Sequence, residues 1–197
     1  PTRVQLHSPR QTEVLRRWGV ATCHAVDQTT LGASLSGLLE FEEAPPEPLE
    51  DLVRRLVAEA EPLERLVSDA IALAEVAEAA HRRNDRWPHG LADGLRNIAD
   101  LMEMHQAREP VAYAGALKCE RSSAQIVRRM LAEHRCVRRR LATVRESTAG
   151  LQAPPQACAT WRLLYVLCTK IDSDLERRMA MEEGRIYAPM LRNRTEV

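Results

Sequence analysis

The chain has 197 residues, which is enough for one good hydrophobic core and a small accessory domain. Hydrophobic residues make up 45% of it, charged residues 28% and aromatic residues only 4%, a composition that favours helices because strands prefer β-branched and aromatic residues. Lysine plus arginine and aspartate plus glutamate both number 28, so the formal net charge is zero. No global field is therefore expected to draw the chain onto nucleic acid or an anionic membrane.

The first predicted elements form a small helical unit. Ser8 and Pro9 suit the N-cap and first position of a helix that Gly19 can end. A second short helix is expected over residues 30–41, and the proline-rich segment that follows cannot be the interior of a helix. We therefore predict a small helical N-terminal domain over residues 1–43, a linker over 44–48 and a helical bundle over 49–197.

The bundle part is divided by prolines and glycines. Pro62 begins a new helix in this prediction, and the pair Pro88 and Gly90 interrupts the next one. Helices are expected over residues 49–60, 62–86, 91–106, 122–146 and 158–183, with an ambiguous segment at 107–121 and a loop at 147–157. The predicted fold class is all-α.

Polar residues occupy positions on the inward-facing stripes of these helices. His134 lies in the slot between Met130 and Val137, where a bundle seam expects an apolar side chain. The stripes of the other helices lead to Asn84 (with His81 beside it), His105, Arg178 and Glu182. Buried polar groups are costly when unpaired, and helical bundles build metal sites from inward-facing histidines and carboxylates. The same pattern also fits hydrogen-bonded core histidines, so the stripes alone leave both interpretations open.

Cysteine usage and the lack of a targeting signal indicate a cytoplasmic protein. The five cysteines are odd in number and have no Cys-x2-Cys spacing, which favours reduced thiols. No apolar run approaches the ~20 residues of a membrane span, and the charged segment 1–17 has no apolar core of a signal peptide.

One stretch of sequence resembles a known family. Residues 154–165, Pro-Pro-Gln-Ala-Cys-Ala-Thr-Trp-Arg-Leu-Leu-Tyr, are similar to the start of the last bundle helix in the hemerythrin-like repair-of-iron-centres proteins, di-iron proteins linked to nitrosative and oxidative stress. The resemblance continues through residues 171–175 and 181–191, includes Met-Leu-Ala-Glu-His at 130–134, and extends to a small N-terminal domain over 10–35. It implies a hemerythrin-like bundle preceded by a small helical domain.

The resemblance also implies iron ligands from all four bundle helices. His134 and Glu182 match two of them, whereas Arg178 stands at the last-helix histidine and Asn84 at the first-helix histidine. His81 or His89 could substitute if the register shifts, and His105 is a further candidate. The family's His-x3-Glu helix is not found after His105, and its N-terminal Cys-Cys is Cys23-His24, a possible thiol site.

Two functions follow from this comparison. The first is a metal-free binding or regulatory module of the iron–sulfur cluster repair type, acting in the response to iron, nitrosative or oxidative stress. The second is a repair protein that still binds iron at a mononuclear or dinuclear site. In both, we expect Arg178 to form a salt bridge with Glu182 near His134, because a guanidinium cannot become a ligand but can supply positive charge.

Other functional features are weaker. No phosphate-binding loop, nucleophile elbow or paired-carboxylate pattern indicates an enzyme. The arginine-rich face of the 122–146 helix (Arg128, Arg129, Arg135, Arg138, Arg139, Arg140 and Arg145) could contact a protein partner, although a solvated face balanced by nearby acids explains it more simply. The resemblance also implies a homodimer.

Overall fold

The computed structural model describes residues 8–22, 25–26, 47–118 and 124–192. The expected helix over 30–41, most of the linker and the Cys23-His24 pair lie outside the described residues. The described elements are α1 (Pro9–Arg17), β1 (Val20–Thr22), β2 (Ala25–Val26), α3 (Leu49–Ala80), α4 (Leu91–Gln106), α5 (Glu109–Leu117), α6 (Ala124–Ser147), α7 (Ala159–Met181), the π-helix η2 (Glu182–Tyr187) and α8 (Ala188–Arg192).

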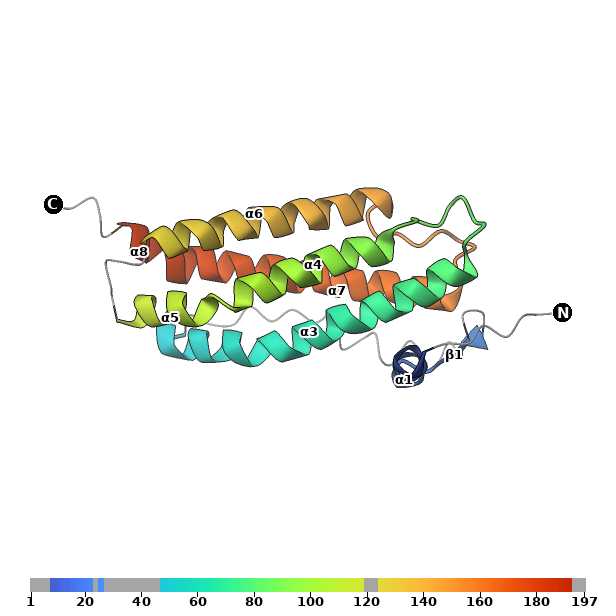
Figure 1. Cartoon of the computed structure of the whole chain (residues 1–197), viewed down its shortest axis with the longest axis horizontal. Coiled ribbons are helices and arrows are strands. Elements are labelled where there is room, and N and C mark those ends of the chain that lie inside the picture. The colour runs from blue at the N-terminus through green and yellow to red at the C-terminus, as the bar shows by residue number, and fades with distance from the viewer. Residues whose placement is uncertain (1–7, 23–24, 27–46, 119–123, 193–197) are drawn as a thin grey trace.

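These helices form a four-helix bundle, which confirms the predicted all-α class. Helix α3 packs against α4 and α7, and α6 packs against α4 and α7. Figure 1 shows the α3–α4 and α6–α7 connections at one end of the bundle, and α5 and α8 at the other. The strands β1 and β2 form a small antiparallel hairpin that was not predicted. Among the described residues, no helix combines the length and the apolar character needed to cross a membrane.

Two predicted helix boundaries were wrong at the start of the bundle. Helix α3 is continuous through Pro62, where two helices were expected, and it ends at Ala80, before Arg86. A proline inside a helix removes one backbone donor, but Leu56 and Leu63 are buried on either side of it, so packing maintains the helix across this point. The ambiguous segment after residue 106 contains α5.

The last helix also differs from the prediction, which ended it at Glu183 before Gly184. The chain continues through Gly184 as the π-helix η2, followed by α8. A π-helix is a rare wide turn with i→i+5 hydrogen bonds, and such turns are frequent at functional sites. Here η2 begins at Glu182, one of the predicted metal ligands.

A buried carboxylate is one of the contacts that attach the N-terminal helix to the bundle. Asp69 of α3 accepts hydrogen bonds from the Arg17 guanidinium at 2.9 and 3.1 Å and from the Trp18 indole at 3.0 Å. The helix α1 begins with a capping box at Ser8, so its own start is locally satisfied. The position of the boundary between the N-terminal domain and the linker stays a prediction.

We expect Asp69→Ala to loosen α1 without unfolding the bundle. The Trp18 indole would lose its charged acceptor, a hydrogen bond worth about 1–2 kcal/mol. Limited proteolysis should therefore cut near α1 faster in this variant, while Glu13→Ala, which changes only an exposed partner of Arg17, serves as the control. Equal cleavage rates in the two variants would show that Asp69 does not hold α1.

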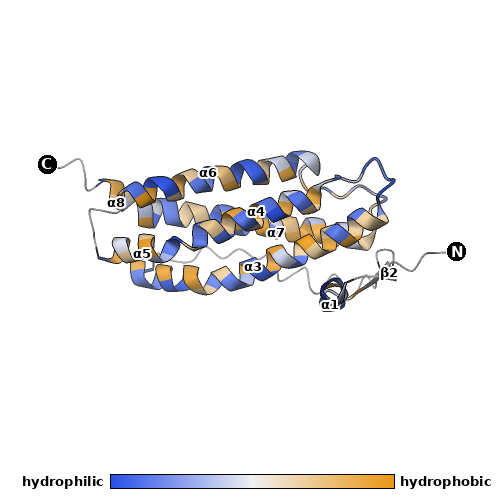
Figure 2. Ribbon diagram, viewed as in Figure 1, coloured by the Kyte–Doolittle hydropathy of each residue, from blue (hydrophilic) through white to orange (hydrophobic). Residues whose placement is uncertain are grey.

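The core of the bundle is divided into two apolar parts. One is the long cluster that includes Leu63, Met102, Val137 and Leu175. The other fills the end near α5 and α8 and is formed by Leu52, Leu56, Ala112, Tyr113, Ala116, Val127, Met130, Ile186 and Tyr187. On α6 the break between the two falls between Met130 and Val137, where His134 is buried as part of a layer of polar side chains. Figure 2 shows, by contrast, hydrophilic residues over much of α6 and in the α3–α4 connection.

Candidate metal centre

Five charged or titratable side chains make up the buried polar layer. They are His105 at the end of α4, Glu109 at the start of α5, His134 of α6, Arg178 of α7 and Glu182 of η2. Their exposed fractions are between 0% and 7%. Residues of these types are almost never buried unless paired, so the layer must satisfy its own charges.

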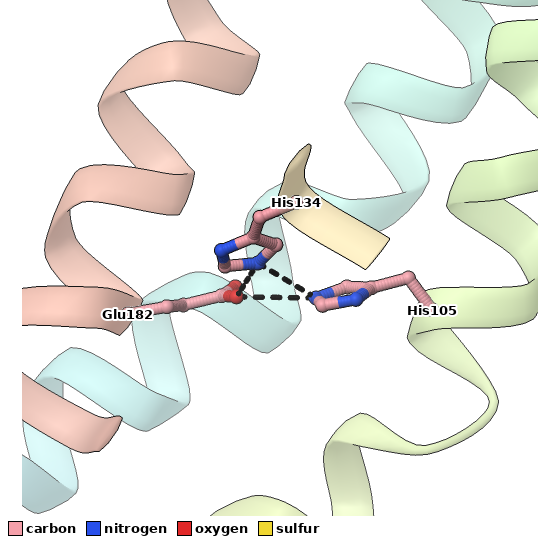
Figure 3. Close-up of side chains that lie close together, drawn as sticks. All are labelled: His105, His134 and Glu182. Carbon is pink, nitrogen blue, oxygen red and sulfur yellow. Dashed lines mark hydrogen bonds and ion pairs between the residues drawn. The ribbon is translucent and has the colours of Figure 1, made fainter. Parts of the chain in front are cut away.

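Three members of the layer direct donor atoms at one point (Figure 3). The Nε2 atoms of His105 and His134 lie 3.2 Å apart, and they lie 3.2 and 3.0 Å from Oε2 of Glu182. Within the described part of the chain, this is the one group of His, Cys, Asp and Glu side chains with the proximity needed to hold a metal ion. Two ligand atoms at right angles around an ion at about 2.1–2.2 Å lie about 3.0 Å apart, so the observed separations match.

The other nitrogen of each imidazole faces a second carboxylate. His105 Nδ1 lies 3.2 Å from Oε2 of Glu133, and His134 Nδ1 lies 2.8 Å from Oε1 of Glu183. Each imidazole therefore lies between two carboxylates, and when a cation occupies the centre the hydrogen of each ring belongs on Nδ1 and the lone pair on Nε2. Metal-ligating histidines show this arrangement, in which an outer carboxylate fixes the ring.

Arginines hold the outer carboxylates in turn. Glu183 accepts from Arg138 at 2.6 Å, and Glu133 is paired with Arg108 and Arg129, each at 3.2 Å. Several arginines of the α6 face are therefore occupied by nearby acids: Arg129 with Glu133, Arg138 with Glu176 and Glu183, and Arg145 with Asp172. These pairs favour the simpler interpretation of that face.

The fourth charged member, Arg178, fills the other half of the layer. Its Nε lies 3.0 Å from Oε1 of Glu182, which confirms the expected salt bridge. One terminal nitrogen, Nη2, lies 2.8 Å from both carboxylate oxygens of Glu109, and the other, Nη1, donates to the Leu56 carbonyl at 2.6 Å. The guanidinium thus sits between the two buried carboxylates, where a second metal ion would need them.

Electrostatics balance the layer without a metal ion. Burial alone would raise the pKa of Glu182, but hydrogen bonds from His105 and His134 and the charge of Arg178 lower it well below its usual value. Burial alone would lower the pKa of His105, but the carboxylate of Glu182 raises it. The cations on Arg178 and a protonated His105 then offset the anions on Glu109 and Glu182.

The π-helix positions a further partner of the central carboxylate. Residues five apart share a face of a π-helix, and Tyr187 accordingly donates its hydroxyl to Glu182 Oε2 at 3.1 Å. Tyr113 of α5 donates to Oε1 at 2.9 Å. Burial raises the pKa of both tyrosines far above its usual value, so both remain hydrogen-bond donors.

The remaining predicted ligands lie away from this layer. His81 ends α3 at the opposite end of the bundle, where its ring stacks on Trp87. Asn84 and the exposed His89 are in the following turn. Helix α3 itself (Leu49–Ala80) contains no histidine, and the assignment of the first-helix ligand to Asn84 stays a prediction.

Sequence reasoning also missed Glu109. The expected His-x3-Glu pair was sought after His105, although His105 and Glu109 themselves have this spacing. Helix α4 ends only three residues before α5 begins, so both side chains still reach the layer. The spacing is present in the sequence, but it was missed because the secondary structure of residues 107–121 was ambiguous in the prediction.

A four-helix bundle with convergent histidine and glutamate donors defines the class of hemerythrin-like proteins. Residues 51–191 match the model of the "Hemerythrin HHE cation binding domain", and the chain belongs to this family. Relatives named "Iron-sulfur cluster repair protein YtfE" are 28% identical in Musicola paradisiaca and 26% identical in Yersinia pestis. In both comparisons the similarity covers 93% of this chain and 92% of the relative.

Proposed function

We propose that this protein is an iron–sulfur cluster repair type protein that binds one iron ion, at His105, His134 and Glu182. The homology to the repair proteins supports the general class. The observation that carries the proposal is the convergence of two imidazole Nε2 atoms and one carboxylate oxygen within 3.2 Å of one another. Two histidines with one carboxylate are a known donor set for non-haem iron(II).

The donor set fits one ion and does not fit two. A second ion would need Glu109 and the free side of Glu182, and Arg178 contacts both. Helix α3 adds no histidine at this level. Relative to the di-iron pattern the site is therefore degenerate, with a permanent guanidinium charge in place of one metal ion.

This arrangement gives the protein's own residues defined tasks. Glu133 and Glu183 hold the imidazole rings with Nε2 inward. Tyr113 and Tyr187 orient the Glu182 carboxylate. Arg178 pairs with Glu182 and Glu109 inside the core. Iron(II), when bound by three protein ligands, keeps coordination positions that suit a small ligand or transfer to an acceptor. We place this activity in the response to iron, nitrosative or oxidative stress. A homodimer, a further protein partner and a cytoplasmic location stay predictions.

Metal analysis tests the proposal directly. Protein loaded anaerobically with iron(II) and desalted is expected to retain about one iron per chain. His134→Ala should lose the iron and keep the helical circular dichroism spectrum, while His81→Ala, at the other end of the bundle, should keep the iron. Absence of iron in the unmodified chain would favour the metal-free module, and about two irons would show that Arg178 moves aside.

A further inference from the structure

A second histidine-containing cluster lies at the end of the bundle opposite the metal layer. Cys158 precedes α7 as its N-cap residue, and its sulfur lies 3.1 Å from Nε2 of His81, the residue that ends α3. Both residues are half-buried. Cys158 is also part of the stretch that carried the family resemblance, and nothing in the metal centre uses it.

Two features of the surroundings act on the sulfur of Cys158. Its sulfur accepts a hydrogen bond from the Trp161 backbone N–H at 3.5 Å, at the positive end of the 23-residue helix α7. A helix N-terminus and a neighbouring imidazole are two environments known to make a cysteine nucleophilic, and here both act on one sulfur. Cys168, deeper in the same helix, is the opposite case, because burial raises the pKa of its thiol to about 12.

Aromatic rings hold the imidazole in place. The His81 ring is stacked on Trp87 with centroids 5.6 Å apart and lies tilted against Trp161 at 5.3 Å. Nearby, the Trp87 indole nitrogen and the Thr160 hydroxyl are buried, and neither has a hydrogen-bond partner among the described residues. Buried donors without partners are unfavourable.

We propose that Cys158 and His81 form a reactive thiol–imidazole pair that takes small electrophiles, with hydrogen peroxide as the oxidant class. The thiol proton passes to Nε2 of His81, and the sulfur attacks one oxygen of the peroxide. An S–O bond forms while the O–O bond breaks, so the sulfur loses two electrons and the peroxide gains them. The departing hydroxide takes the proton from His81 and leaves as water, and Cys158 becomes a sulfenic acid.

The test compares cysteines within one protein. Under limiting iodoacetamide at neutral pH, peptide mapping should show Cys158 alkylated at least about tenfold faster than half-buried Cys136, with Cys168 unlabelled. After brief exposure to hydrogen peroxide, a sulfenic-acid probe should label Cys158 and leave Cys136 unlabelled. Cys158→Ser is the blank, and it should fold well because serine is a good N-cap. Alkylation of Cys158 no faster than that of Cys136 would overturn the proposal.

His81 is tested through a pH profile. His81→Gln should slow alkylation of Cys158 at neutral pH by about tenfold and leave the rate unchanged at alkaline pH, where the thiol ionises without help. A purely structural role for His81 predicts instead the same ratio at all pH values, or an accelerated rate from local unfolding. Either of those profiles would remove His81 from the pair. Iron content is measured in parallel and should not change, which keeps this result separate from the metal centre.

Discussion

Replacing Arg178 by leucine is expected to lower the free energy of unfolding of the metal-free protein by about 3–5 kcal/mol. Arg178 is 5% exposed and is paired with both buried carboxylates of the layer and with the Leu56 carbonyl. Without the guanidinium, Glu109 and Glu182 would share the pocket as like charges, and the carbonyl would lose its donor. The measurement is urea unfolding in the presence of a chelator, followed by circular dichroism.

The neighbouring residue provides a matched control for this experiment. Arg177 is paired with Glu59 and Asp174 at 3.4 and 3.8 Å, and its side chain is 40% exposed. Exposed pairs contribute little, so Arg177→Leu should change the free energy of unfolding by less than about 1 kcal/mol. If the two variants unfold at the same urea concentration, Arg178 is not the charge that holds the layer together.

The sequence predicted most of this layer because helix periodicity reports which side chains face inward. His105, His134, Arg178 and Glu182 were all found as polar residues on apolar stripes, and the structure brings these four together. Periodicity works where a helix is long and uninterrupted, as in α6 and α7. Periodicity predicts well in which direction a side chain points around the axis of one helix.

Periodicity predicts poorly how far along the bundle axis a side chain lies, because that position depends on where each helix begins. The apolar stripe and the family resemblance placed the first-helix ligand at Asn84, which the structure puts in the turn after α3, at the other end of the bundle from the layer. The outer carboxylates could not be predicted either. Glu133 and Glu183 are sequence neighbours of His134 and Glu182, and consecutive helical residues point about 100° apart, so their contacts depend on how the helices pack.

In the proposed one-ion site, the layer would keep its fold without a second metal ion. Two buried carboxylates need positive charge, which a metal ion, a protonated histidine or a guanidinium can supply. Arg178 supplies it permanently on the side of Glu109, whereas His105 supplies it by a proton on the other side. A proton can be exchanged for a metal ion, but a guanidinium cannot. The two halves of the layer therefore differ in chemistry although their carboxylates are alike.

The converse change should restore a second metal position. In Arg178→His the permanent cation is removed, an imidazole donor is added, and Glu109 is freed from its bidentate partner. We expect the iron content after anaerobic loading to rise from about one to about two per chain, measured by mass spectrometry of the metal together with protein concentration. Glu109→Gln in the same background should return the value to about one, because the second ion would lose its own carboxylate.

Arg178→Gln separates the two causes. This variant removes the positive charge but adds only an amide, a weak ligand for iron, so it should remain at about one iron per chain. A value near two in Arg178→Gln would mean that relief of charge alone admits the second ion and that the imidazole is not needed. No gain in Arg178→His, with one iron still bound in the unmodified protein, would mean that Arg178 does not occupy a former metal position.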